Sequence, residues 1–138
     1  RYLMDKKILI ITSSYYEEIS TNLLNGAQNF LKNKNLYNDV LNVPGTFEIP
    51  FALNVQKASY DGFIVLGCVI RGETYHFEII SNQVSRKIMD LSIEINKPIG
   101  FGILTCENID QAMIRSNPAQ GNKGSEAAKA CVDLLKIQ

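Results

Sequence analysis

The sequence predicts an α/β domain in which helices cover both faces of a parallel sheet. The chain has 138 residues, of which 46% are apolar, enough for one globular domain with a single core. Short aliphatic runs alternate four times with longer segments of helical periodicity, the last of which is split in two. Because a helix follows each strand, we expect the strands to be parallel and residues 6–138 to form one domain.

The first half of the chain supplies two strands and two helices. Residues 6–12 are a short aliphatic run of the kind that fills a central parallel strand. From about residue 17 to 34, apolar side chains recur at intervals of three and four, as on one face of a helix. A second strand fits residues 37–43, and a proline and a glycine end it. The next helix has Pro50 in its first turn and runs to about residue 59.

The third strand and the helix after it carry the most unusual chemistry. Residues 62–70 are nearly all apolar and rich in β-branched types, which indicates a strand buried on both faces. A polar turn follows, where Thr74 can cap a helix of about residues 74–96 with His76, the single histidine, in its first turn. Such a helix start presents free N–H groups and the positive end of the helix dipole. This stretch therefore predicts an anion site beside an imidazole.

The long helix has a broader apolar surface than one face of a small domain needs. Besides a stripe with helical spacing, Ile79, Met89 and Ile93 add apolar side chains next to it. We therefore expect part of this helix to pack on another subunit.

The last third of the chain supplies one strand and the split helix. Residues 99–105 form the fourth strand, and a short helix is expected at about residues 108–116. A polar glycine turn at residues 121–124 leads to a final helix from residue 125 to about 137. Residues 1–5 are expected to be a flexible N-terminal arm or a remnant of expression.

Composition narrows the function classes. Positive and negative side chains number 14 each, so no overall field draws the protein to nucleic acid or to a membrane. The apolar runs are shorter than the roughly 18 to 20 residues of a membrane span, and a secretory hydrophobic segment is missing, so we expect a cytoplasmic protein. Three cysteines without a C-x-x-C pair, and one histidine, argue against a disulfide framework and a metal site.

Polar and aromatic residues gather where the predicted strands end, which is where open parallel sheets bind ligands. His76 can transfer protons there, or it can simply pack. Glu48 can accept hydrogen bonds from a polyhydroxy substrate or complement a helix dipole, and Glu73 fits a helix-start residue better than a substrate ligand. Tyr15 and Tyr16 can stack on a planar ring or pack at the rim of a pocket.

Two basic residues and a thiol complete the candidates. Arg115 and Lys123 lie near and within the second glycine turn and can bind phosphate, although surface solvation is the alternative for both. The turn lacks the spacing of a Walker A loop, which argues against an NTPase. Cys68, two residues inside the end of a buried strand, fits an inert core thiol better than a nucleophile.

Four motifs together closely resemble the 6,7-dimethyl-8-ribityllumazine synthase family. They occupy residues 44–50, 67–77, 101–105 and 121–124, in the family's order and spacing, and the similarity runs from about residue 6 to the C-terminus. The resemblance implies a flavodoxin-like three-layer sandwich with a four-stranded parallel sheet in the order 2-1-3-4. It also implies a homopentamer or a higher multiple, with the long helix lining a five-fold axis.

The reaction that the resemblance implies is the penultimate step of riboflavin biosynthesis. 5-Amino-6-(D-ribitylamino)uracil condenses with 3,4-dihydroxy-2-butanone 4-phosphate to give 6,7-dimethyl-8-ribityllumazine, releasing phosphate and water. The imine forms between the two substrates, so this transferase uses no cofactor and no nucleophilic cysteine or lysine.

The resemblance also implies roles for individual residues. His76 would shuttle protons, and the phosphate would lie at Glu73 and Thr74 and be held by Arg115. The residues that bind the ribityl chain and the heterocycle would be Thr46, Phe47, Glu48, Cys68, Val69, Ile70 and Tyr15. The neighbouring subunit would contribute Phe101, Lys123 and Arg115, with Glu126 as a possible partner of Arg115.

Two positions depart from the family pattern, and three other functions stay open. Tyr16 stands where members often have Asn, which affects one ring contact, and Ala119 stands where many have Lys, which removes one charge. The alternatives are a flavin- or lumazine-binding module without catalysis, a hydrolase that uses Cys68 with His76, and a catalytically silent shell protein. The presence of His76, Thr74 and Arg115 argues against the first of these.

Overall fold

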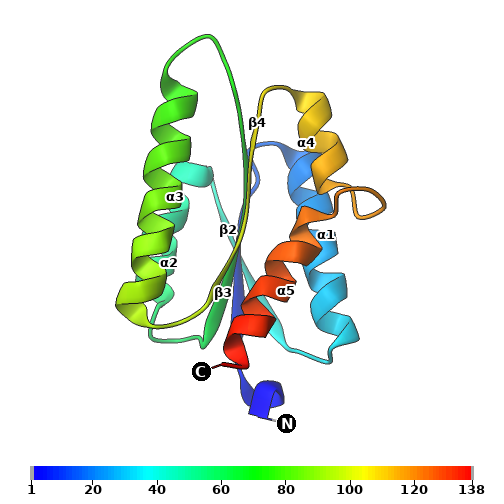
Figure 1. The fold of residues 1–138 in the computed structure, drawn as a ribbon, viewed down its shortest axis with the longest axis vertical. Coiled ribbons are helices and arrows are strands. Elements are labelled where there is room, and N and C mark those ends of the chain that lie inside the picture. Colours follow the sequence, from blue (N-terminus) through cyan, green and yellow to red (C-terminus); the bar gives the residue numbers. More distant parts are fainter. Residues whose placement is uncertain (1, 138) are drawn as a thin grey trace.

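The computed structural model describes residues 2–137 and contains the predicted parallel sheet, in the order β2-β1-β3-β4 (Figure 1). Its strands are β1 (Ile8–Ser13), β2 (Asn38–Val43), β3 (Gly62–Ile70) and β4 (Ile99–Cys106). In register, Ile8 of β1 lies opposite Asn38 on one side and Gly62 on the other. The predicted flavodoxin-like fold is confirmed.

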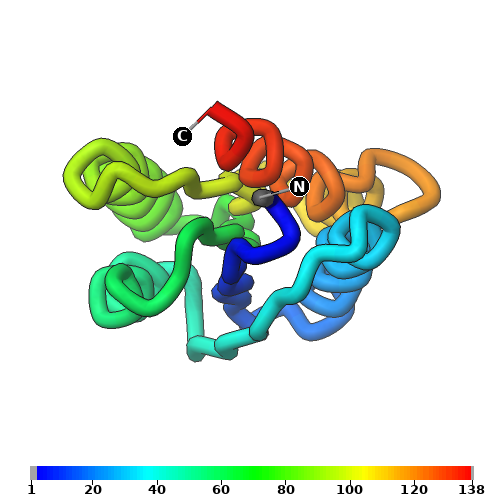
Figure 2. Tube along the Cα trace, turned by 90° about the horizontal axis from the view of Figure 1, so that it is seen from below, coloured from blue at the N-terminus to red at the C-terminus, as the bar shows by residue number. Residues whose placement is uncertain are grey.

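Helices cover both faces of the sheet, so the molecule has three layers (Figure 2). One face carries α1 (Glu17–Asn33), α4 (Ile109–Ser116) and α5 (Lys123–Leu135). The other face carries α2 (Ile49–Gln56) and α3 (His76–Ile95). Two short 3-10 helices, η1 (Tyr2–Asp5) and η2 (Thr46–Glu48), precede β1 and α2.

The core consists of two apolar clusters, one on each face of the sheet. Along β1, Ile8 and Ile10 pack under α1 and α5, whereas Leu9 and Ile11 pack under α2 and α3. All four side chains are at most 2% exposed. Burial of each contributes about 1.5 to 3 kcal/mol, so an unbroken aliphatic run stabilises the middle of the sheet and leaves polar residues for its ends.

Two helix starts differ from the sequence prediction. The N-cap of α3 is Tyr75 and not Thr74, although the Thr74 hydroxyl accepts a hydrogen bond from the His76 N–H at 3.4 Å. Helix α5 begins at Lys123, two residues early, because Asn122 takes a left-handed conformation (φ 49°) and turns the chain into it. Gly124 thus belongs to the helix, where a Cβ would lie 2.0 Å from the Leu23 carbonyl oxygen of α1.

The remaining boundaries agree within a few residues. Helix α2 ends at Gln56, three residues early, where the Ser59 N–H donates to the Gln56 carbonyl in a turn. The predicted N-terminal arm includes residue 1, which lies outside the described residues, and within residues 2–5 Leu3 packs against the core. Residue 138, in the predicted domain, also lies outside them. Within the described chain, no helix is both long and apolar enough to cross a membrane.

Candidate active site

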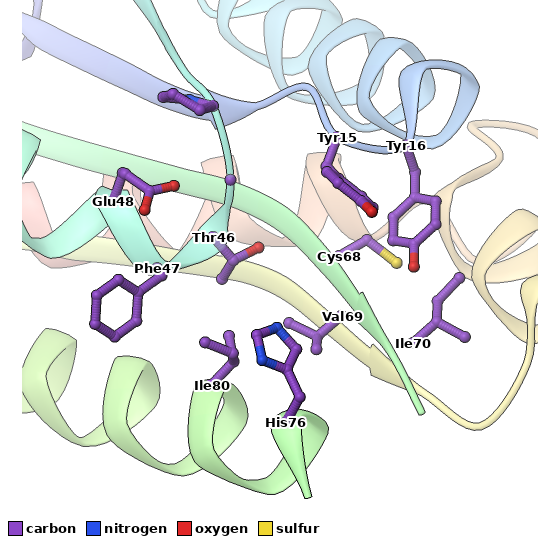
Figure 3. Close-up of a pocket in the computed structure, with 12 residues that line it drawn as sticks. Tyr15, Tyr16, Thr46, Phe47, Glu48, Cys68, Val69, Ile70, His76 and Ile80 are labelled. Atoms are coloured by element: carbon purple, nitrogen blue, oxygen red, sulfur yellow. The ribbon is translucent and has the colours of Figure 1, made fainter. Parts of the chain in front are cut away.

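A pocket of about 390 Å³ lies beyond the carboxyl ends of β1, β2 and β3, where the strand order reverses (Figure 3). We call it the His76 pocket. It is lined by Tyr15, Tyr16, Pro44, Gly45, Thr46, Phe47, Glu48, Cys68, Val69, Ile70, His76 and Ile80. The structure therefore brings together eight predicted site residues that are spread over three segments of the sequence.

The wall between β1 and β3 depends on the absence of a side chain at Gly67. A Cβ there would lie 2.8 Å from Ser13 Oγ and 2.9 Å from Thr46 Oγ1. These two hydroxyls are buried and lie 3.4 Å apart, within hydrogen-bond distance of each other. Gly67 thus allows β3 to lie close to Ser13 at the end of β1 and to Thr46 at the start of η2.

His76 enters the pocket from the first residue of α3. Figure 3 shows its imidazole pointing toward Val69 and Thr46, with Ile80 beside it. Ile80 follows His76 by one helical turn, so both lie on the same face of α3. The side chain of His76 is exposed, which leaves the ring accessible to a substrate in the pocket.

An aromatic pair forms another wall of the His76 pocket. The rings of Tyr15 and Tyr16 meet edge to face, with centroids 5.0 Å apart and an interplanar angle of 83°. Tyr16 is half-buried against the core, and this burial raises the pKa of its hydroxyl. Tyr15 is 75% exposed, so the face of its ring is free to stack on a planar ligand.

The Cys68 thiol lines the pocket but is not suited to act as a nucleophile. Its side chain is 8% exposed, and burial raises its pKa to about 12, with the neighbouring Cys106 adding to the shift. Because the thiolate is the nucleophilic form, the thiol stays protonated and unreactive at neutral pH. The unreactive thiol argues against a hydrolase that uses Cys68 with His76.

Polar groups for a hydroxylated ligand come from η2. Thr46 is buried, and Phe47 and Glu48 are exposed at the mouth of the pocket. The Glu48 carboxylate folds toward Gly45, so that a Cβ at Gly45 would lie 3.1 Å from Glu48 Oε1. Among the described residues, no side chain donates a hydrogen bond to this carboxylate, and it can accept them from a ligand.

A second pocket, of about 420 Å³, lies along the exposed edge of β4, between that strand and α4 and α5. We call it the Arg115 pocket. Its lining includes Phe101, Thr105, Arg115, Lys123 and Glu126, and it shares no residue with the His76 pocket. Within one chain, the predicted site residues therefore form two separate groups.

The charged side chains of the Arg115 pocket are held locally. Arg115 Nη1 donates to the Gln111 carbonyl oxygen at 3.3 Å, and Lys123 Nζ lies 3.1 Å from Glu126 Oε1. The family resemblance had suggested that Glu126 pairs with Arg115. In the structure it pairs with Lys123 instead, because Lys123 and Glu126 lie one turn apart on α5. Arg115 keeps its guanidinium available for an anion.

Glu73 and Thr74 line neither pocket. They lie on the exposed loop between β3 and α3, which arches over the carboxyl edge of the sheet (Figure 1). The predicted site residues did not include Ser13, Gly67 or Ile80, although Ser13 directly follows the first predicted strand, Gly67 opens the motif at residues 67–77, and Ile80 has helical spacing from His76. Among residues 2–137, no group of three or more His, Cys, Asp or Glu side chains could hold a metal ion.

Comparisons with known proteins identify the family of this chain. The sequence model of the 6,7-dimethyl-8-ribityllumazine synthase family matches residues 5–138. A protein of that name from Bartonella tribocorum is 45% identical over 134 residues, which cover 95% of this chain and 89% of the relative. One from Novosphingobium aromaticivorans is 45% identical over 134 residues and covers 96% of each chain. The chain belongs to the 6,7-dimethyl-8-ribityllumazine synthase family.

Proposed function

We propose that this transferase of riboflavin biosynthesis condenses its two substrates in the His76 pocket. The substrates are 5-amino-6-(D-ribitylamino)uracil and 3,4-dihydroxy-2-butanone 4-phosphate, and the product is 6,7-dimethyl-8-ribityllumazine, with phosphate and water released. The protein has to hold two molecules together, stabilise a leaving phosphate and move protons. Each of these tasks has a candidate group in the two pockets.

The aminouracil fits the part of the pocket between Tyr15 and β3. The exposed ring of Tyr15 provides a stacking face, and the end of β3 at Cys68, Val69 and Ile70 provides main-chain contacts for the pyrimidine. Thr46 and Glu48, together with Phe47, would bind the ribityl chain, since hydroxyl and carboxylate oxygens accept hydrogen bonds from a polyol. His76 would then transfer protons during phosphate elimination and ring closure.

The phosphate fits the loop above the start of α3. Free N–H groups and the positive end of the helix dipole favour an anion there, next to Glu73 and Thr74. Arg115 and Lys123 would neutralise the phosphate, but they belong to the other pocket of the same chain. The separation of the two pockets is the observation that carries our proposal of a shared site, in which a neighbouring subunit supplies Arg115, Phe101 and Lys123.

Such a shared site requires head-to-tail packing of identical chains, and we propose at least a homopentamer. The exposed edge of β4 and the exposed apolar residues Met89 and Ile93 of α3 support this, because both leave surface that a second subunit can cover. We also propose a cytoplasmic location, which suits three free buried cysteines.

Co-expression of two variants tests the shared site. Alone, His76→Ala should lower kcat about a hundredfold, because it removes a general acid-base. Arg115→Ala should raise the KM of the phosphate substrate by about tenfold or more, through lost charged hydrogen bonds. The assay uses the phosphate substrate well below its wild-type KM, where sites that lack Arg115 are also nearly inactive. In mixed assemblies, about a quarter of the shared sites lack both changes, so about a quarter of the wild-type activity should return.

The matched control co-expresses wild-type chains with the double variant His76→Ala/Arg115→Ala. A shared site again predicts about a quarter of the wild-type activity, whereas a site within one chain predicts about half. For a site within one chain, the mixture of single variants would show no recovery at all. Product is followed by lumazine absorbance. If the wild-type oligomer binds lumazine tightly but makes no lumazine from the two substrates, the protein is a non-catalytic binding module and not the enzyme.

A further inference from the structure

Arg71 makes a cluster of contacts that the proposed reaction does not use. It follows the last residue of β3 and opens the loop that carries Glu73 and Thr74. We propose that Arg71 is a positioning residue, which holds this loop and the start of α3 in the geometry that binds the substrate phosphate. This inference rests on the proposed function, because it assigns the phosphate to that loop.

The side chain of Arg71 joins the end of β3 to the start of α3, six and seven residues on, and to Glu107, which lies 36 residues away in the sequence. Its Nη1 forms an ion pair with Glu78 in the first turn of α3, and its Nε donates to Glu107 Oε1 at 2.9 Å, after β4. Its guanidinium also lies over the Phe77 ring, 4.4 Å from the centroid. The main-chain N–H of Arg71 donates to the Cys106 carbonyl oxygen at 2.9 Å.

These contacts fix both ends of the loop at residues 72–75. Its first end is tied to β4, and its second end, at the helix start, is tied to Arg71 through Phe77 and Glu78. A planar guanidinium can bond two carboxylates and stack on a ring at the same time, which a lysine ammonium cannot. Glu107 also leads directly into α4, which carries Arg115 in its last turn. Arg71 therefore fixes the loop between elements whose positions are set by the core.

A direct role of Arg71 as a phosphate ligand agrees less well with the structure. Its guanidinium is already paired with two carboxylates, and this pairing lowers the pKa of Glu78 and raises that of Arg71. To bind phosphate it would have to leave both partners. The paired arrangement also keeps the negative charges of Glu78 and Glu107 neutralised beside a site for a dianion.

Steady-state kinetics with each substrate varied in turn tests the positioning role. Arg71→Gln should raise the KM of the phosphate substrate about tenfold, with a change of less than about twofold for the aminouracil. Arg71→Lys keeps the positive charge but loses the bidentate guanidinium and its planar face, so its KM for the phosphate substrate should be close to that of Arg71→Gln. The control is Lys129→Gln, which breaks an exposed ion pair with Asp133 on α5 and should leave both KM values unchanged.

Glu107→Ala separates positioning from charge by the sign of its effect. It removes one contact of Arg71 and also one negative charge near the phosphate. Loss of positioning predicts a higher KM for the phosphate substrate, whereas an effect of charge alone predicts a lower one. A lower value, or full recovery in Arg71→Lys, would overturn the proposal. This variant also provides the test if Arg71→Gln fails to fold.

Binding of inorganic phosphate, measured by calorimetry, gives a readout that does not depend on turnover. Its Kd should rise about tenfold in Arg71→Gln and stay unchanged in Lys129→Gln. If the wild type is active and Arg71→Gln has the same KM for the phosphate substrate and the same Kd for phosphate as the wild type, the positioning role is wrong while the proposed function stands. A wild-type protein that makes no product would instead contradict the proposed function.

Discussion

Two buried thiols, Cys68 and Cys131, show how burial controls chemistry at single residues. Burial raises the pKa of each to about 12, and Cys131 of α5 is fully buried against β3 and β4. In the unfolded chain, these thiols would lose their protons near their ordinary pKa of about 8.5. Between about pH 9 and pH 11, the unfolded state therefore binds fewer protons than the folded state, and stability falls as pH rises.

We expect Cys131→Ala to reduce this pH dependence. Over that range, the free energy of unfolding of the variant should fall less steeply than that of the wild type, by on the order of 1 kcal/mol per pH unit. Urea unfolding at several pH values measures the slopes. Val132→Ala, at a neighbouring buried position, creates a cavity without removing a titrating group and should keep the wild-type slope. Parallel curves for Cys131→Ala and wild type would contradict the prediction.

At the scale of secondary-structure elements, the close contact between α1 and α5 sets the position of the Arg115 pocket. Gly124 lies in the first turn of α5, and a side chain there would meet the backbone of Leu23. Lys123 and Glu126 come from the same turn and line the pocket. The contact between the two helices thus fixes the place of both charges.

Gly124→Ala should therefore destabilise the fold by about 1 to 3 kcal/mol, because the two helices must move apart. Gly72→Ala is the matched control, since no atom lies within 4 Å of its added Cβ and its φ is negative. That change should be neutral or stabilise the protein by less than about 1 kcal/mol. Equal losses in the two variants, measured by urea unfolding, would show that the helix contact is not the cause.

Prediction from the sequence worked where one strong pattern decided an element. Aliphatic runs predicted β1, β3 and β4, the proline and glycine after residue 43 marked the end of β2, and residue spacing found the buried faces of α1 and α3. It failed at the start of α5, where a glycine next to polar residues resembles a turn but serves a helix contact. It also missed the contacts of Arg71, because Glu107 lies 36 residues away and only the folded strands bring the two together.

The candidate site was predicted largely through the family resemblance. Tyr15, Thr46, Glu48 and His76 do line one pocket, and Arg115 lies in the other, while their roles stay predictions. The pairing of Glu126 could not be read from the resemblance, because Arg115 and Lys123 compete for one carboxylate and side-chain distances decide between them.

For the whole molecule, the proposed assembly makes a direct prediction about α3. Ile93 is 75% exposed in the single chain, although it is a large apolar residue. Ile93→Glu should place an unpaired charge in the interface between subunits and shift the protein to smaller species in sedimentation velocity. Activity should fall with assembly, while far-UV circular dichroism stays unchanged.

Lys32→Glu changes an exposed residue on α1, remote from α3 and β4, and serves as the control for added negative charge. It should sediment like the wild type. An Ile93→Glu protein that also sediments like the wild type, with full activity, would remove α3 from the proposed interface.

The position of the two pockets on separate parts of one chain also bears on stoichiometry. In head-to-tail packing, every subunit presents its His76 pocket to one neighbour and its Arg115 pocket to the other. A linear oligomer always has one unpaired His76 pocket at one end and one unpaired Arg115 pocket at the other. It therefore contains one complete active site fewer than it has chains. Only a closed ring pairs every His76 pocket with an Arg115 pocket. The packing angle that closes the ring therefore gives one complete active site per chain, and it also prevents growth into a filament.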